Sequence, residues 1–417
     1  MERAPRFVAG IDWSHGLNDV AVIDQGGSTI AHARFAATPA GVRELCALLA
    51  GLRASHTHSR RHVPVAIETC EGLLVHALRE KGQQVYQIPP NVVAAYRRRV
   101  SPAPRKSDRS DAELLALILR EGWGWLRPLP DVSSAAASIR ILAQAQLRAQ
   151  VARERVQARL RALLCQAHPA AVDVWAGLDY GLRRREARAV LAAGPTAATA
   201  QRLTPYRLSK ILAAAGRTRL IDAEAYRLAE AFAVPVLRLP APVEQAMAVE
   251  VRTVLDLFEQ ACRASDHLTT QLTDAFLDHG TAKIYTSLPG CGLLTGARLL
   301  AEIGDDPARF ATSKGLRAYA GVAPLTWESG SSRLVTHRRI CDRRLKRTAI
   351  LWAFTSLTRS PGCRTLYDRR RTAGDTYAGA LRRVAGRLLS CLHHCLATGQ
   401  QYDEAAAFST STVVPGD

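Results

Sequence analysis

The order of strand-like and helical segments in the first hundred residues restricts the fold of this chain more than any other feature. Apolar, β-branched runs alternate first with turn residues and then with amphipathic segments of helical period. The expected strands cover residues 7–12, 19–24, 29–35, 63–68 and 84–88. The expected helices cover residues 38–52, 71–80 and 107–119. The first three strands, with a Gly-Gly turn before the third, predict an antiparallel meander, after which helix and strand alternate.

This order is typical of an RNase H-like α/β domain, and the rest of the chain is predicted to be largely helical. Residues 133–164 contain neither Gly nor Pro and keep apolar residues at helical spacing, and a second such stretch covers residues 243–277. We therefore predict an α/β domain followed by an all-α part. The expected parts are an RNase H-like domain at 1–125, a helical, coiled-coil region at 126–283, a mainly helical C-terminal domain at 284–402 and a disordered tail at 403–417.

The chain is strongly basic. Its 417 residues include 56 Lys and Arg against 37 Asp and Glu, which gives a formal net charge of +19. Such an excess goes beyond what solubility requires and favours a polyanionic partner, nucleic acid first of all. No apolar run approaches the roughly 20 residues of a membrane span, and the first residues lack the features of a secretory signal. We therefore expect a cytoplasmic, nucleoid-associated protein. Its Ala- and Arg-rich composition is typical of a GC-rich bacterial genome.

Four carboxylates occupy positions where they can converge. Asp12 and Glu68 each end an apolar strand, and Asp108 and Asp111 stand three residues apart at the start of a helix, on one helical face. Hard cations such as Mg²⁺ prefer oxygen ligands, and Mn²⁺ can substitute for Mg²⁺. Any single acidic residue at such a position more commonly caps or solvates the end of its element. The four together, in this order of elements, predict a Mg²⁺ site for phosphodiester chemistry.

The C-terminal third contains two features suited to phosphate. The turn Leu288-Pro-Gly-Cys-Gly precedes an apolar helix and has the form of a helix-hairpin-helix, in which Gly290 and Gly292 would let backbone amides approach a phosphate. An ordinary helix-turn-helix packing unit is the alternative. Residues 333–371 contain twelve Lys and Arg against two Asp, which predicts a surface for a phosphate backbone rather than only a solvated helix face. The expected contacts from its first half are Arg333, Arg338, Arg339, Arg343, Arg344, Lys346 and Arg347.

Residues 327–333, Trp-Glu-Ser-Gly-Ser-Ser-Arg, form a small-residue loop just before the basic segment. A hydroxyl in this loop could face a bound backbone. No His or Asp stands in a familiar arrangement with these serines, so the residue chemistry by itself favours an ordinary loop over a nucleophile.

Several motifs together resemble one family, the DEDD-type insertion-sequence transposases, which act as bridge-RNA-guided DNA recombinases. The motifs are Gly10-Ile-Asp-Trp-Ser, Ala66-Ile-Glu-Thr, Lys106-Ser-Asp-Arg-Ser-Asp111, Leu288-Pro-Gly-Cys-Gly, Ala320-Gly-Val-Ala-Pro and Ser329-Gly330. The resemblance implies that Asp12, Glu68, Asp108 and Asp111 are the acidic residues of a RuvC-like domain. It also implies a serine, matched by Ser329, that attacks DNA to form a phosphoserine link. The site would be completed between subunits of a dimer or tetramer, with donor and target DNA and a structured guide RNA as partners.

The chain departs from the family pattern after the serine. The family commonly has Gly-Asn or Gly-Asp before the Leu-Arg of the basic helix, whereas this chain has Ile340-Cys-Asp-Arg-Arg-Leu-Lys. Ser331 and Ser332 therefore remain alternatives to Ser329. Two other functions are alternatives to the recombinase: a Mg²⁺-dependent junction nuclease that forms no covalent link, and an inactive nucleic-acid-binding protein.

Overall fold

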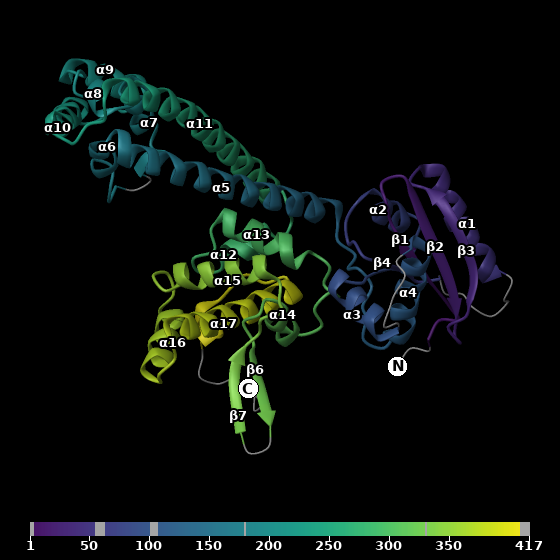
Figure 1. Ribbon diagram of the computed structural model, residues 1–417. Coiled ribbons are helices and arrows are strands. Elements are labelled where there is room, and N and C mark those ends of the chain that lie inside the picture. Colours follow the sequence, from purple (N-terminus) through teal and green to yellow (C-terminus); the bar gives the residue numbers. More distant parts are fainter. Residues whose placement is uncertain (1–3, 55–62, 101–106, 179–180, 330–331, 409–417) are drawn as a thin grey trace. The chain divides into compact units, whose positions relative to one another are not determined.

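The computed structural model describes residues 4–54, 63–100, 107–178, 181–329 and 332–408 of the chain (Figure 1). The chain divides into two compact units, Met1–Asp131 and Val132–Asp417. In the described part of the chain, no helix is both long enough and apolar enough to cross a membrane.

The first unit is built on a five-stranded mixed sheet. Its strands are β1 (Phe7–Asp12), β2 (Leu17–Asp24), β3 (Thr29–Ala36), β4 (Val65–Ile67) and β5 (Val85–Gln87). They lie in the order β3-β2-β1-β4-β5, in which β1, β2 and β3 are antiparallel neighbours and β4 and β5 run parallel to β1. Its helices are α1 (Pro39–Ala54), α2 (Leu73–Glu80), α3 (Pro90–Val100) and α4 (Asp108–Glu121). The predicted RNase H-like fold is confirmed, and α3 is a helix that the sequence analysis did not predict.

Helices cover both faces of this sheet, so β1 is buried on both sides. Ala9 and Ile11 pack into a cluster with α1 and α2, while Val8 packs into a second cluster with α3 and α4. Gly10 faces α4 at very short range: a Cβ at this position would lie 2.5 Å from the backbone nitrogen of Ala116. Only glycine allows the α4 backbone to lie this close to the strand.

The second unit begins with two long helices packed side by side, α5 (Ser134–Ala167) and α11 (Ala241–Leu277). They are antiparallel, because Gln146 of α5 bonds to Thr269 of α11 at 3.1 Å and Arg159, further along α5, bonds to Glu250 at 3.2 Å. The shorter elements between them are α6 (Pro169–Asp173), the 3₁₀ turn η1 (Gly181–Arg183), α7 (Arg185–Ala193), α8 (Ala197–Ala200), α9 (Pro205–Ala214) and α10 (Ile221–Ala233). These elements share a core with the far halves of α5 and α11 (Figure 1). The two long helices predicted from the sequence are therefore present.

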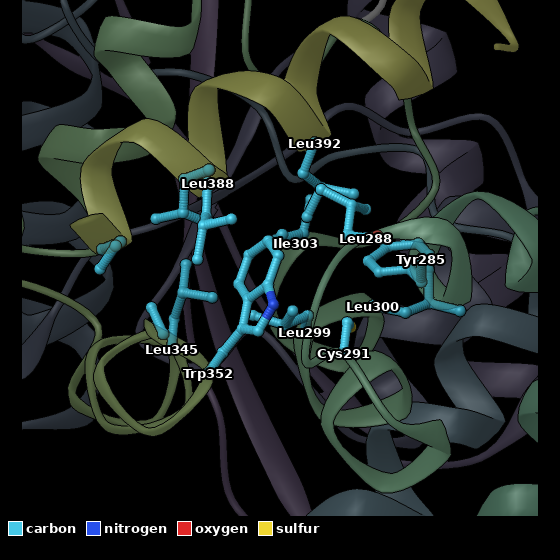
Figure 2. Close-up of a cluster of buried hydrophobic side chains, with 14 of the residues drawn as sticks. Tyr285, Leu288, Cys291, Leu299, Leu300, Ile303, Leu345, Trp352, Leu388 and Leu392 are labelled. Atoms are coloured by element: carbon cyan, nitrogen blue, oxygen red, sulfur yellow. The ribbon is translucent and has the colours of Figure 1, made fainter. Parts of the chain in front are cut away.

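The remainder of the second unit is a helical bundle with one hairpin. Its helices are α12 (Ala282–Ser287), α13 (Leu293–Ile303), α14 (Ser313–Tyr319), α15 (Arg343–Ser356), α16 (Pro361–Thr372), α17 (Tyr377–Thr398) and α18 (Glu404–Phe408). Figure 2 shows the fully buried Trp352 ring of α15 among side chains of α13 and α17. Ile139 of α5 and Phe276 of α11 belong to the same core, so the near ends of the long helices are part of this bundle.

Two predictions about the C-terminal region were wrong. The expected loop at 327–333 includes parts of two antiparallel strands, β6 (Pro324–Ser329) and β7 (Ser332–His337), because Leu, Thr, Trp and Val residues that favour strands flank the serines. The expected disordered tail does not begin at residue 403. Glu404 opens α18 and its carboxylate accepts hydrogen bonds from the Ser360 hydroxyl at 2.6 Å and the Gly362 N–H at 2.9 Å. Residues 409–417 lie outside the described residues.

Candidate active site and nucleic-acid interface

The two strand-end carboxylates follow neighbouring parallel strands. Ile11 of β1 pairs with Ile67 of β4, so Asp12 and Glu68 are the next residues at the same level of the sheet. Asp12 is two residues beyond Gly10, and side chains alternate along a strand, so it continues the face of β1 that α4 covers. Both side chains are half-buried.

Helix α4 contributes the other two carboxylates. Its N-terminus is fixed by a capping box: the Ser107 hydroxyl accepts from the Ser110 N–H at 3.2 Å, and the Ser107 N–H donates to the Ser110 hydroxyl at 3.1 Å. Asp108 and Asp111 therefore stand in the first turn, where the helix dipole favours negative charge. Asp108 is exposed and Asp111 is buried.

The electrostatics of Asp12 show that the predicted acidic residues lie near one another. The pKa of Asp12 is raised from 3.8 to about 6. Burial is the largest cause, followed by repulsion from the charges of Asp111, Asp108, Glu68 and Asp19. A carboxyl surrounded by other carboxylates resists ionisation, because each added negative charge is repelled by its neighbours. A cation at this position would relieve that repulsion.

Two further residues shape this cluster and were missed in the sequence analysis. Asp19 of β2 pairs in register with Asp12, is almost fully buried and accepts a hydrogen bond from Arg34 Nε at 3.0 Å. Arg97, in the last turn of α3, donates to Asp111 at 2.6 Å and holds that carboxylate in place. The hairpin predicted from 7–12 and 19–24 could have indicated Asp19, whereas the Arg97 pair depends on α3.

The described residues contain no group of three or more His, Cys, Asp and Glu side chains already arranged to hold a metal ion. The acidic side chains thus share one region of negative potential without forming a closed set of ligands.

The serine proposed as nucleophile stands at the end of a strand of the second unit. Ser329 is the last residue of β6 and pairs with Ser332, the first residue of β7. Gly330 and Ser331, between them, lie outside the described residues. The four acidic residues and Ser329 therefore belong to different compact units of the chain.

The glycine turn before α13 packs against α15. Gly290 has a positive φ of 70°, and a Cβ there would lie 2.7 Å from the backbone nitrogen of Ser356. The Trp352 indole N–H donates to the Pro289 carbonyl at 2.9 Å from the same helix. Gly290 is thus required for packing, whereas Gly292, the N-cap of α13, is exposed with open space around it. Of the two glycines, Gly292 is the one that leaves the backbone at the N-terminus of α13 accessible.

The predicted basic residues differ in whether their side chains are exposed or already paired within the protein. Arg339, Arg343 and Arg347 are exposed. Arg344 is paired with the buried Glu302 at 2.6 Å, and Lys346 donates to the Arg338 carbonyl at 3.2 Å. Arg333 lies on β7, opposite Glu328. Arg298 of α13, which no sequence pattern singled out, lies beside Arg343, Arg344 and Arg347.

An RNase H-like sheet with acidic residues at the ends of β1 and β4 and in the first turn of α4 defines a class of proteins that process nucleic acids. Residues 9–169 match a family described as "Transposase", and residues 282–368 match the "Transposase IS116/IS110/IS902 family". The chain therefore belongs to the IS110 family of DEDD transposases, and it is an enzyme that acts on DNA.

Individual relatives support this assignment, and the similarity to each covers most of both chains. The chain is 42% identical to a Streptomyces coelicolor protein whose name links it to transposition of the IS117 mini-circle, over 96% of either chain. It is 30% identical to a 43.6 kDa protein of insertion element IS110 from the same organism, over 72% of this chain and 73% of the relative. It is 29% identical to a 42 kDa protein of insertion element IS900 from Mycobacterium paratuberculosis, over 92% and 94%.

Proposed function

We propose that this transposase cuts and rejoins DNA through a phosphoserine formed by Ser329, assisted by Mg²⁺ held among Asp12, Glu68, Asp108 and Asp111. The observation that carries the proposal is the gathering of carboxylates around the half-buried Asp12, whose pKa is raised to about 6 by burial and then by repulsion from these neighbours. Such repulsion costs stability and has no evident structural benefit, which is typical of a functional site.

The acidic residues fit Mg²⁺ in their chemistry. All four supply carboxylate oxygens, the donors that Mg²⁺ prefers, and Mn²⁺ accepts the same ligands. Asp12 and Glu68 would bind from the sheet and Asp108 and Asp111 from α4, with Arg97 orienting Asp111. When bound, the ion supplies positive charge that stabilises a phosphate under attack.

The proposed reaction of Ser329 replaces one P–O bond with another. The Ser329 oxygen forms a bond to phosphorus as it loses its proton, and the bond from phosphorus to the leaving deoxyribose oxygen breaks as that oxygen gains one. Rejoining is the reverse reaction with a hydroxyl of another strand, which releases the serine. Because each step exchanges one P–O bond for another, no external energy source is needed.

Capture of the covalent adduct tests this mechanism. Purified protein is incubated with target DNA and Mg²⁺, denatured, and the modified peptide is mapped. We expect phosphoserine at residue 329, loss of the adduct in Ser329→Ala, and its retention in Ser332→Ala, the matched change on the paired strand. A modified Ser331 or Ser332 would move the assignment, and cleavage without any adduct would favour the junction nuclease.

Metal-site variants test the carboxylates separately. Asp12→Asn and Glu68→Gln should lose strand cleavage but still bind nucleic acid, since each removes a charged ligand far along the chain from the basic residues. Cleavage at the wild-type rate by the double variant would refute the metal site. An absence of Mg²⁺-dependent cleavage in the wild type would favour an inactive binding protein.

We also propose that the active enzyme is a homo-oligomer, a dimer or tetramer, in which the acidic unit of one subunit acts with Ser329 of another. Mixing two inactive variants tests this arrangement. In a shared site, subunits with Asp12→Asn and subunits with Ser329→Ala would together restore one intact combination, so partial cleavage should return. If each subunit uses its own serine, the mixture stays inactive.

A structured guide RNA is the remaining proposed partner. The net charge of +19 exceeds what solubility requires and supports binding of polyanions, RNA as well as DNA. Sequencing the nucleic acid that co-purifies with the protein tests this partner. A discrete transcript from the flanking element is the expected result, and random cellular RNA would contradict it.

A further inference from the structure

A cavity of about 240 Å³ lies where three helices of the second unit meet, α5, α13 and α15. Its polar lining consists of Gln150, Arg298, Glu302, Arg343, Arg344, Arg347 and Thr348. Four guanidinium groups and one carboxylate thus line the same cavity. We refer to this cavity as the arginine pocket.

Most of this positive charge is not neutralised within the protein. Glu302 is buried and pairs with Arg344 at 2.6 Å. Among the described residues, Arg298, Arg343 and Arg347 have no carboxylate within ion-pair distance. The pocket is therefore a concave surface with three unpaired cations.

Arg298 is the cation that the fold holds in place. Its Nη2 donates to the side-chain oxygens of Gln146 and Gln150 of α5, the latter at 2.7 Å, while its Nε is buried without a hydrogen-bond partner. Burial and the nearby charge of Arg347 lower the pKa of Arg298. A partly desolvated guanidinium beside another cation is unfavourable unless an anion joins them.

We propose that the arginine pocket binds one phosphate of a nucleic-acid backbone, with Arg298 as the fixed contact and Arg343 and Arg347 closing over it. This inference rests on the proposed nucleic-acid function of the basic residues of α15. A guanidinium group can donate two parallel hydrogen bonds to the oxygens of one phosphate, and these charge-assisted bonds are stronger than neutral ones. Such a contact positions the backbone without reading its sequence.

The pocket would make α5 part of the nucleic-acid site. Gln146 and Gln150 orient Arg298, so a helix of the long antiparallel pair sets the position of a phosphate contact that α13 and α15 provide. The basic residues of α15 would then act as a fixed phosphate site rather than a diffuse charged surface.

Salt dependence of binding measures how many phosphates the protein neutralises. For duplex DNA, the logarithm of the binding constant falls linearly with the logarithm of the salt concentration. This slope should become shallower by about 0.9 for each phosphate that a variant no longer neutralises. Arg298→Gln and Arg347→Gln are each expected to flatten this slope. Because both hold one phosphate, the double variant should lose about 0.9 and not about 1.8. Arg347 is exposed and has no hydrogen bond in the described structure, so its variant remains informative if Arg298→Gln destabilises the bundle.

The matched control is Arg219→Gln, an equal change of charge at an exposed arginine between α9 and α10. Arms with a DNA duplex and with an RNA hairpin distinguish the source of the phosphate, and a change in either supports the pocket. Slopes equal to that of the control, or a decrease of about 1.8 in the double variant, would overturn the inference. If the wild type itself shows no salt-dependent binding, the proposed nucleic-acid function fails instead.

Discussion

The substitution Gly10→Ala tests how the acidic residues are brought together. A Cβ at position 10 would lie 2.5 Å from the backbone nitrogen of Ala116 and 2.9 Å from the Cβ of Leu115, and nearer still to the carbonyl of Ala112. Contacts of a real Cβ essentially never fall below 3.0 Å. Two of these three neighbours are backbone atoms of a helix, so α4 would have to move away from β1 as a body, by more than about 0.5 Å because the Ala112 carbonyl is nearer than the Ala116 nitrogen.

Such a movement should affect both stability and activity. Overpacking of a core commonly costs about 1–3 kcal/mol of the free energy of unfolding. It would also carry Asp108 and Asp111 away from Asp12 and Glu68. Since a misplacement on the order of 1 Å can cost roughly 100-fold in rate, we expect cleavage to fall by roughly 10- to 100-fold.

Gly16→Ala is the matched control. No atom lies within 4 Å of a Cβ at Gly16, and its φ is outside the positive range, so alanine should be neutral or slightly stabilising there. Urea unfolding and a strand-cleavage assay in Mg²⁺ are measured for both variants. If Gly10→Ala matches the control in stability and in rate, close packing of α4 on β1 does not organise the site.

Three further predictions address charge and packing. Without metal, Asp12→Asn should raise the free energy of unfolding at pH 7 by about 1–2 kcal/mol after allowance for partial exposure. The pKa of Asp12 in the folded protein, about 6, lies above the ordinary 3.8, so the wild type loses stability as the pH rises from about 4 to 6. Urea unfolding should therefore show a difference in the free energy of unfolding between the two proteins at pH 7 and little difference at pH 4. Equal free energies of unfolding at pH 7 would contradict this prediction. Replacing Arg343, Arg344 and Arg347 together with Gln should lower the salt slope of DNA binding by at least about 0.9, and an unchanged slope would place the contacts elsewhere. Trp352→Phe should destabilise the protein by about 1–3 kcal/mol in thermal unfolding, because it leaves a carbonyl of the glycine turn unpaired; an unchanged midpoint would show that this hydrogen bond contributes nothing.

Local patterns in the sequence were sufficient for most elements of the first unit and for the two long helices of the second. The meander of β1, β2 and β3, the helices α1, α2 and α4, and the two long helices α5 and α11 all follow from periodic burial of apolar side chains along a short stretch of chain. Strand ends are also visible in this way, which is why Asp12 and Glu68 could be singled out. The family motifs are likewise short and contiguous.

The tertiary structure decided which groups meet across distant parts of the chain. Gly10 lies against the backbone of α4, Arg97 reaches Asp111 from a helix that was not predicted, and Gly290 serves the packing of α15. Arg298 gains its surroundings from three helices that are far apart in sequence. No periodicity encodes these contacts, because each depends on where two packed elements lie relative to each other. The sequence by itself therefore determined most of the elements and the main candidate residues, whereas packing decided how buried, how charged and how constrained each of those residues is.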